Sequence, residues 1–234
     1  MTDIVLATSN PHKVDEMNAI FAELMPAAIR FVTLREAAAG RSLIEPAETG
    51  TTFEANAIIK ALSYAEQTGM LCLADDSGIE IDALGGRPGV ISSHYCTNGV
   101  EIGMSREERD AANNAKVLHD LRDVPDAQRA ARFVCVMTLA QCTPACPQAP
   151  PLDGDSKPAA ARILWCVRGT FEGRIAHHAV GAGGFGYDPL FLVAPGFDRA
   201  AAELSPAEKN RRSHRGEAAR LFAAELGGWF GARR

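Results

Sequence analysis

The chain lacks the features that mark several large classes of protein. Among its 234 residues no apolar run approaches the ~20 residues of a membrane-spanning helix, so we expect no membrane span. The segment from Met1 to Lys13 lacks the basic start and long apolar core of a secretion signal. The formal net charge is -5, which argues against a general nucleic-acid binder because such a protein shows a basic face. We therefore expect neither a nucleic-acid nor a membrane partner.

Cysteine is sparse and shows no regular spacing. The six cysteines lie at positions 72, 96, 135, 142, 146 and 166. Cys142 and Cys146 lie near each other in the sequence, but no second cysteine or histidine pair stands at the spacing of a zinc site, so a metal site there is not expected. Three of them, Cys72, Cys135 and Cys166, fall in apolar runs, where a free cysteine behaves as a small hydrophobe. A chain of this length buries enough surface to fold without a disulfide or a structural metal, so we expect a reduced, cytosolic protein.

The most informative stretch runs from Leu71 to Gly78. An apolar run that starts at Met70 predicts a short buried strand, and it ends in two adjacent carboxylates, Asp75 and Asp76. Adjacent carboxylates repel each other unless a cation or a proton lies between them. A magnesium ion held by one or two carboxylates and by substrate phosphates would meet that need. The letters Asp-Ser-Gly also suit an ordinary turn, which this stretch alone favours, and the rest of the chain reverses that preference.

A second candidate site lies near the start of the chain. A strand from Asp3 to Ala7 is followed by a loop from Thr8 to Lys13, in which Asn10 suits an N-cap and Pro11 suits the first helical position. The free N–H groups of a helix N-terminus attract phosphate, so this loop is a candidate phosphate site. The alternative is a plain capped helix with a solvated lysine. No Walker A pattern occurs, so a P-loop NTPase is not supported.

The middle of the chain predicts a further strand and a helix. We expect a strand from Arg30 to Leu34, and a capping box of Thr51 and Glu54 that opens a helix from Phe53 to about Thr68. Asn56 and Lys60 are four residues apart and so share one face of that helix. Lys60 is either solvated or directed toward Asp75 and Asp76.

The rest of the chain alternates between strands and helices. Capping boxes of Ser105 with Glu108 and of Ser205 with Glu208 predict two more helices. We expect strands at 79–83, 132–140, 161–168 and 190–193, and a last helix at 217–226. The segment 143–157 is rich in proline and polar residues, which predicts a peripheral hairpin loop.

A glycine-rich loop follows the last long strand, between Gly181 and Pro189. Its four glycines within six residues let the backbone approach a ligand closely. Phe185 and Tyr187 offer flat faces on which a base could stack, with Asp188 beside them as an acceptor. A dense basic cluster follows, made of Lys209, Arg211, Arg212, His214 and Arg215. Such a run is usually a solvated face, but after this loop it suits a nucleotide better.

Taken together, the motifs resemble those of the inosine triphosphate pyrophosphatase family. They are Thr8-Ser9-Asn10 with Lys13, Glu48-Thr49-Gly50 with Phe53 to Ala61, Ala74 to Gly78, Gly85 to Gly89, Gly184 to Pro189, and Ser213 to Gly216. The resemblance implies an elongated α/β fold of two lobes, with a curved mixed sheet flanked by helices and a central cleft, in a single domain over 1–234. It also implies a homodimer, Mg²⁺, and hydrolysis of ITP, dITP and XTP to the monophosphate and pyrophosphate.

The resemblance also implies roles for individual residues. Asp76 would be the proton acceptor and a metal ligand, with Asp75 and Glu48 as further metal ligands. The implied substrate contacts are Thr8, Ser9, Asn10, Pro11, His12, Lys13, Lys60, Ser77, Phe185, Gly186, Tyr187, Asp188, Lys209, His214 and Arg215. Some relatives carry an acidic residue immediately before Glu-Thr-Gly, but Ala47 stands here. The second metal carboxylate is therefore left open between Glu45 and Glu48.

Three other functions fit the sequence less well than this one. A Maf-like pyrophosphatase acting on pyrimidine or methylated nucleotides would have arginines where this chain has Asn10 and Lys13. A nucleotide-binding sensor without catalysis would gain nothing from carboxylates placed beside phosphates. A nucleic-acid-binding module is disfavoured by the acidic balance of the chain.

Overall fold

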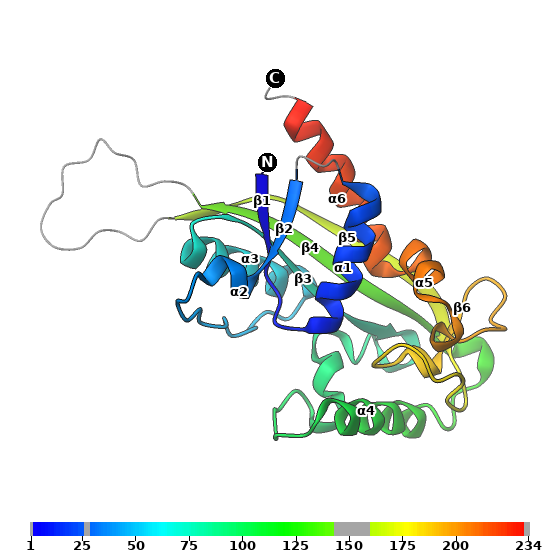
Figure 1. Ribbon diagram of the computed structural model, residues 1–234. Coiled ribbons are helices and arrows are strands. Elements are labelled where there is room, and N and C mark those ends of the chain that lie inside the picture. The colour runs from blue at the N-terminus through cyan, green and yellow to red at the C-terminus, as the bar shows by residue number, and fades with distance from the viewer. Residues whose placement is uncertain (1, 26–28, 143–159, 232–234) are drawn as a thin grey trace, which may run out of the picture. The chain divides into compact units, whose positions relative to one another are not determined.

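The computed structural model describes residues 2–25, 29–142 and 160–231 (Figure 1). In this part of the chain six strands form one mixed sheet in the order β2-β1-β3-β4-β5-β6. They are β1 (Thr2–Leu6), β2 (Ile29–Thr33), β3 (Leu71–Ile81), β4 (Ala130–Cys142), β5 (Ala161–Ile175) and β6 (Phe191–Val193). Strand β1 pairs in parallel with β2 and with β3, whereas β5 and β6 are antiparallel. The predicted α/β class with a mixed sheet is confirmed, and the predicted cleft stays a prediction.

All the predicted helices are present, most of them with their predicted caps. The α-helices are α1 (Pro11–Leu24), α2 (Leu34–Ala38), α3 (Phe53–Thr68), α4 (Arg106–Asp120), α5 (Pro206–Arg212) and α6 (His214–Gly231). Asn10, Ser105 and Ser205 cap α1, α4 and α5 as expected. The predicted cap of α3 was wrong by one residue, because Thr52 takes the extended N-cap conformation and accepts from the N–H of Ala55. Helix α2 was not predicted.

The chain divides into two compact units. The first comprises residues 1–76, 136–168 and 219–234, and the second comprises residues 77–135 and 169–218. Strands β3, β4 and β5 each contribute residues to both units. The predicted loop at 143–157 lies outside the described residues, and the single-domain assignment stays a prediction.

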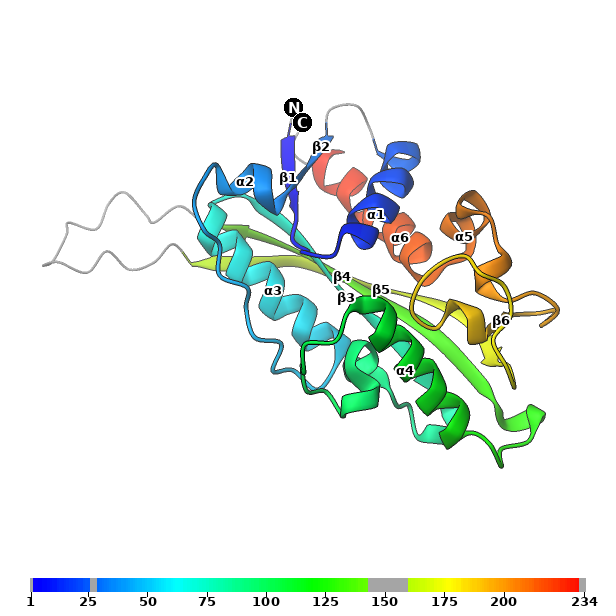
Figure 2. The same ribbon diagram turned by 60° about the horizontal axis from the view of Figure 1, so that its bottom comes forward.

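In the first unit, helices cover both faces of the sheet (Figure 2). Helix α1 lies beside α6, and the ring centroids of Phe21 and Phe222 are 5.7 Å apart. Helix α3 lies on the other face, where Tyr64 packs in one cluster with Cys72 and Ala74. Because successive residues of a strand point to opposite faces, β3 is buried on both sides in this unit.

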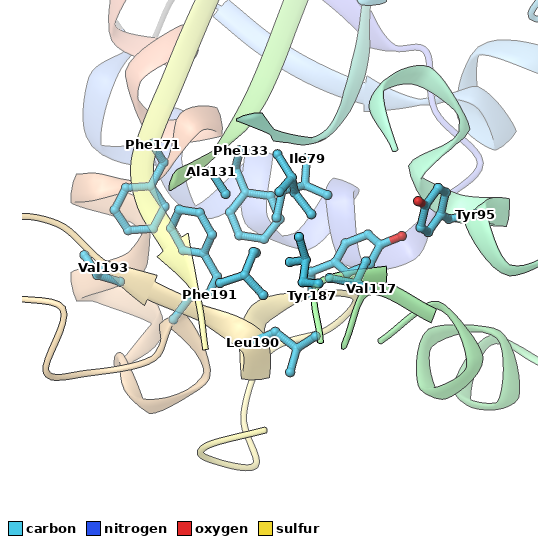
Figure 3. Close-up of a cluster of buried hydrophobic side chains, with 14 residues drawn as sticks. Ile79, Tyr95, Val117, Ala131, Phe133, Phe171, Tyr187, Leu190, Phe191 and Val193 are labelled. Carbon is cyan, nitrogen blue, oxygen red and sulfur yellow. The ribbon is translucent and has the colours of Figure 1, made fainter. Parts of the chain in front are cut away.

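The core of the second unit is a hydrophobic cluster that contains five aromatic residues (Figure 3). The Phe191 ring centroid lies 4.5 Å from that of Phe133 and 5.3 Å from that of Phe171. The ring of Tyr187 belongs to the same cluster. Ile175 at the end of β5 and Leu190 just before β6 both belong to this core, which therefore holds the chain on either side of the segment between them.

Strand β3 is the largest correction to the sequence prediction. It is one strand of 11 residues, so Asp75 and Asp76 stand neither at a strand end nor in a turn. Residues 79–81 of the strand expected at 79–83 are its continuation, whereas Asp82–Leu84 form a 3-10 helix instead of a strand. Gly78 permits the strand to continue past Ser92, because any other residue would place a Cβ atom 2.3 Å from the Ser92 Oγ atom.

No helix in the described part of the chain is long and apolar enough to cross a membrane.

Candidate active site

Three carboxylates and two lysines gather around the middle of β3 in the first unit. Asp75 and Asp76 are buried, with only 1% and 6% of each residue exposed. Lys13 Nζ lies 2.8 Å from Asp75 Oδ2. Lys60 Nζ lies 3.3 Å from Asp76 Oδ1 and 2.9 Å from Glu48 Oε1. We call these five residues the carboxylate–lysine cluster.

The two helices that flank β3 explain why both lysines reach it. Asp75 and Asp76 are consecutive in the strand, so their side chains point to opposite faces of the sheet. Lys13 comes from the first turn of α1 on one face, and Lys60 comes from α3 on the other. Each buried carboxylate therefore has a lysine from the helix that covers its own face.

The charges of the cluster do not cancel, because three carboxylates share two lysines. Burial by itself would lower the pKa of Lys60, but the carboxylates of Asp76, Asp75 and Glu48 outweigh it and raise that pKa. Burial raises the pKa of Asp76 above its ordinary value, and the nearby Glu48 and Asp75 add to the rise against the pull of the lysines. A raised pKa makes this carboxylate a stronger base than an ordinary aspartate, which suits it to accept a proton.

Asn56 links Asp76 to the loop that carries Glu48. Its amide Nδ2 donates to Asp76 Oδ2 at 3.2 Å, and its Oδ1 accepts from the N–H of Gly50 at 2.8 Å. The residue is 2% exposed, so both bonds are shielded from water. Asn56 was not predicted as a site residue, although its spacing of four from Lys60 was a usable signal.

Gly50 leaves no room for a side chain, which gives a first prediction. A Cβ at this position would lie 2.6 Å from the Ala55 Cβ atom and 2.7 Å from Asn56 Oδ1. Gly50→Ala should therefore displace the Glu48 loop and lower the rate of triphosphate hydrolysis by roughly tenfold, the effect of one lost hydrogen bond. Gly227→Ala is the control, because no atom lies within 4 Å of a Cβ there. Steady-state rates of the two variants test this, and equal rates would contradict it.

The N-terminal loop is held mainly by its own turn and cap. Asn10 Oδ1 accepts from the N–H of His12 at 3.1 Å, and the N–H of Asn10 donates to Thr8 Oγ1 at 3.3 Å. Ser9 Oγ donates to Glu45 Oε1 at 3.2 Å. Of the two glutamates left open by the sequence, Glu48 lies in the carboxylate–lysine cluster and Glu45 is tied to Ser9.

A second group of predicted residues meets in the second unit, around the segment Gly184 to Asp188, which we call the aromatic loop. Asp188 is buried and accepts from the N–H of Phe185 at 2.9 Å and from Lys209 Nζ at 2.7 Å. The Lys209 Nζ atom also lies 4.7 Å from the centroid of the Phe185 ring. The sequence was right to bring Phe185, Asp188 and Lys209 together, although their roles stay predictions.

Three residues of α4 also contact the aromatic loop, and the sequence analysis missed them. The Arg106 guanidinium lies 5.5 Å from the Phe185 ring centroid. Asp110 Oδ2 accepts from the N–H of Gly186 at 2.9 Å, and Asn114 Nδ2 donates to the Gly186 carbonyl at 3.0 Å. Their spacing of four residues puts them on one face of the helix, which was the available signal.

Tyr187 does not offer the open face that the sequence suggested. Its ring is 5% exposed within the aromatic core, and its hydroxyl donates to the Ser92 carbonyl at 2.7 Å. The local sequence pattern shows an aromatic residue beside glycines. It does not show that the ring packs into the core of the second unit. A contact of Tyr187 with substrate stays a prediction, whereas its packing role is plain (Figure 3).

The basic pair that begins α6 is buried as well. His214 stacks on Phe133, with ring centroids 5.0 Å apart and an interplanar angle of 17°. Arg215 donates from Nη2 to Ser77 Oγ at 3.0 Å. Ser77 and Arg215, two predicted substrate contacts, are therefore in contact with each other.

The carboxylate–lysine cluster fits a cation that takes some of its ligands from a substrate. Among the described residues, no three or more His, Cys, Asp or Glu side chains form a group that could hold a metal ion. Oxygens of Glu48 and Asp76 nevertheless converge on one positive centre, Lys60 Nζ, at 2.9 and 3.3 Å. Mg²⁺ is typically bound by one or two carboxylates, substrate phosphates and water, so this donor set suits it.

Comparison with known proteins places the chain in a family. The model of the Ham1 family matches residues 4–225. The chain is 42% identical to the dITP/XTP pyrophosphatase of Pseudomonas syringae pv. tomato over 227 residues, 97% of this chain and 98% of that protein. It is 40% identical to the Pseudomonas aeruginosa enzyme of the same name, with the same coverage. The solved structure of a HAM1 protein from Coxiella burnetii has a TM-score of 0.73 and 38% identity, covering 97% of this chain and 100% of that one. The chain therefore belongs to the Ham1 family.

Proposed function

We propose that this protein hydrolyses non-standard purine nucleoside triphosphates, such as ITP, dITP and XTP, to the monophosphate and pyrophosphate. The observation that carries the proposal is the buried Asp76 carboxylate, held by Lys60 and Asn56 within a cluster that has one excess negative charge. Relatives about 40% identical over nearly the whole chain are named dITP/XTP pyrophosphatases, which supports the same chemistry here.

The carboxylate–lysine cluster would act on the triphosphate. Lys13 and Lys60 would neutralise phosphate oxygens, and Asp76 would accept the proton of the attacking water. Glu48 and Asp76 would hold Mg²⁺, with Asp75 as a further predicted ligand that is paired with Lys13. The ion, when bound, would supply charge neutralisation at bridging phosphate oxygens. Thr8 to His12 stay predicted phosphate contacts at the N-terminus of α1.

The second unit would recognise the purine. Phe185 supplies an aromatic face, and Lys209, His214, Arg215 and backbone N–H groups supply donors. Inosine and xanthosine carry a keto oxygen at position 6, which accepts a hydrogen bond, whereas adenosine presents a donor there. A donor of the protein facing a donor of adenine leaves both unpaired, which is costly in a water-poor site.

The selectivity of hydrolysis gives the second prediction. Release of pyrophosphate from ITP should be at least ~100-fold more efficient than release from ATP, the scale of a site that reads one polar group. The assay compares kcat/KM for ITP, XTP, GTP, ATP and TTP, each with and without Mg²⁺. Equal efficiency on ATP would contradict the purine-keto model. Preference for TTP would indicate a Maf-like enzyme, and binding without hydrolysis would indicate a sensor.

The resemblance to the family supports three further parts of the proposal. The protein would be a cytosolic homodimer and would need neither a nucleic-acid nor a membrane partner for activity. Sedimentation of the purified protein at micromolar concentration tests the dimer. A monomer with full activity would remove it from the proposal.

A further inference from the structure

Helix α4 presents a line of three polar side chains to the aromatic loop. Arg106, Asp110 and Asn114 are spaced by four residues and so follow one face of the helix. Two of them bind the backbone of the same residue. The N–H of Gly186 donates to Asp110 Oδ2 at 2.9 Å, and the Gly186 carbonyl accepts from Asn114 Nδ2 at 3.0 Å.

These two contacts fix the direction of two consecutive peptide planes. The N–H belongs to the peptide that joins Phe185 to Gly186, and the carbonyl belongs to the peptide that follows. A carboxylate can only accept and the amide Nδ2 can only donate, so a flip of either peptide would lose its bond. Gly186 has φ +61°, a left-handed conformation that glycine leaves as easily as it enters. The α4 side chains therefore select one conformation of a segment that is otherwise permissive.

The same contacts determine where the Phe185 ring lies. The N–H of Phe185 is bonded to Asp188, and Tyr187 is anchored in the core. Gly186 stands between these two fixed residues, and Asp110 and Asn114 hold it. The Phe185 ring is also approached by Arg106 and Lys209. A side chain held this tightly can orient a ligand without paying to order itself on binding.

We propose that Asp110 and Asn114 are positioning residues that fix the aromatic loop and thereby set the enzyme's selectivity for the purine. The inference rests on the proposed function, because it takes Phe185 to be the residue that meets the base. Neither side chain needs to touch the substrate. Their effect passes through the two peptide planes of Gly186.

The test uses isosteric variants with opposite expectations. Asn114→Asp keeps the size of the side chain but cannot donate to the Gly186 carbonyl, so it should behave like Asn114→Ala. Asp110→Asn keeps an oxygen that can accept from Gly186, so it should recover most of what Asp110→Ala loses. For the disruptive variants we expect KM for ITP to rise about tenfold and selectivity for ITP over ATP to fall about tenfold, the effect of one hydrogen bond. Their kcat should stay within about threefold, because the carboxylate–lysine cluster is untouched.

A control on the same helix and a measurement without substrate complete the test. Glu107→Ala removes an exposed carboxylate of α4 and should change neither KM nor selectivity. Amide hydrogen exchange should accelerate at 184–188 in Asn114→Asp but not in Glu107→Ala. If the parent is selective for ITP and Asn114→Asp keeps that selectivity, the positioning role is overturned. If the parent does not hydrolyse ITP, the proposed function falls, and unchanged exchange at 184–188 would overturn the positioning role as well.

Discussion

Replacing Asp76 by asparagine is expected to slow the hydrolysis of ITP by ~10²–10⁴-fold, the usual cost of losing a general base. The amide has the size of the carboxylate but neither accepts a proton at neutral pH nor attracts a cation as strongly. The cluster has one carboxylate more than it has lysines, so removing one negative charge leaves the remaining four charges balanced. The fold should therefore survive the change.

Two measurements separate a loss of chemistry from a loss of binding. Single-turnover hydrolysis of ITP reports the chemical step, and nucleotide affinity in Ca²⁺ reports binding, which Asp76→Asn should change much less. Lys60→Ala should weaken binding as well as slow the chemistry, because a phosphate contact acts in both states. Asp3→Asn, which removes a half-buried carboxylate paired with Arg30, is the control and should change neither. If Asp76→Asn stays within a few-fold of the parent, Asp76 is not the base and Asp75 is the next residue to test.

Local signals in the sequence placed most of the helix starts correctly, because an N-cap depends on only a few neighbouring residues. Asn10 with Pro11, Ser105 with Glu108, and Ser205 with Glu208 all act as predicted. The error at α3 has the same local origin. Two threonines stand side by side, and the choice between Thr51 and Thr52 depends on which of them takes the extended conformation.

The course of β3 could not be read from its own residues. Two aspartates, a serine and a glycine in a row are typical of a strand end or a turn. They continue the strand because Lys13 and Lys60 come from helices elsewhere in the sequence and compensate the buried charges on both faces. Sequence motifs named the members of the cluster, whereas their pairing depends on the tertiary fold.

Contacts of helical polar side chains with distant segments were the other feature that the sequence did not show. Asp110, Asn114 and Asn56 are polar residues within helices, a pattern usually found on a solvated face. Each instead bonds a backbone group or a carboxylate from a distant segment. Arginine is also mostly exposed in proteins, so nothing marked Arg129 as an interior residue.

Arg129 precedes β4 in the second unit and, with Arg215, is one of the two largest fully buried side chains of the described residues. Its guanidinium donates to four backbone carbonyls, those of Ile175 and Ala176 at 2.8 Å, of Leu121 at 2.7 Å and of Val124 at 3.3 Å. The side chain thus joins the end of β5 to the segment that follows α4. Burial lowers its pKa from the ordinary arginine value, but guanidinium stays protonated in proteins.

Arg129→Met is expected to lower the free energy of unfolding by about 3–5 kcal/mol, because a methionine of similar length removes the four hydrogen bonds that the guanidinium donates; of these carbonyls, that of Leu121 keeps the N–H of Val124 as a donor. Arg129→Lys should recover only part of this loss, since one ammonium group cannot donate to all four carbonyls that the planar guanidinium reaches. The control is Arg132→Met in the same stretch, where a half-buried arginine pairs with Asp82 and Glu172 and should contribute about 1 kcal/mol or less. Urea unfolding followed by circular dichroism measures all three. Equal losses in Arg129→Met and Arg132→Met would show that the buried fork does not stabilise this unit.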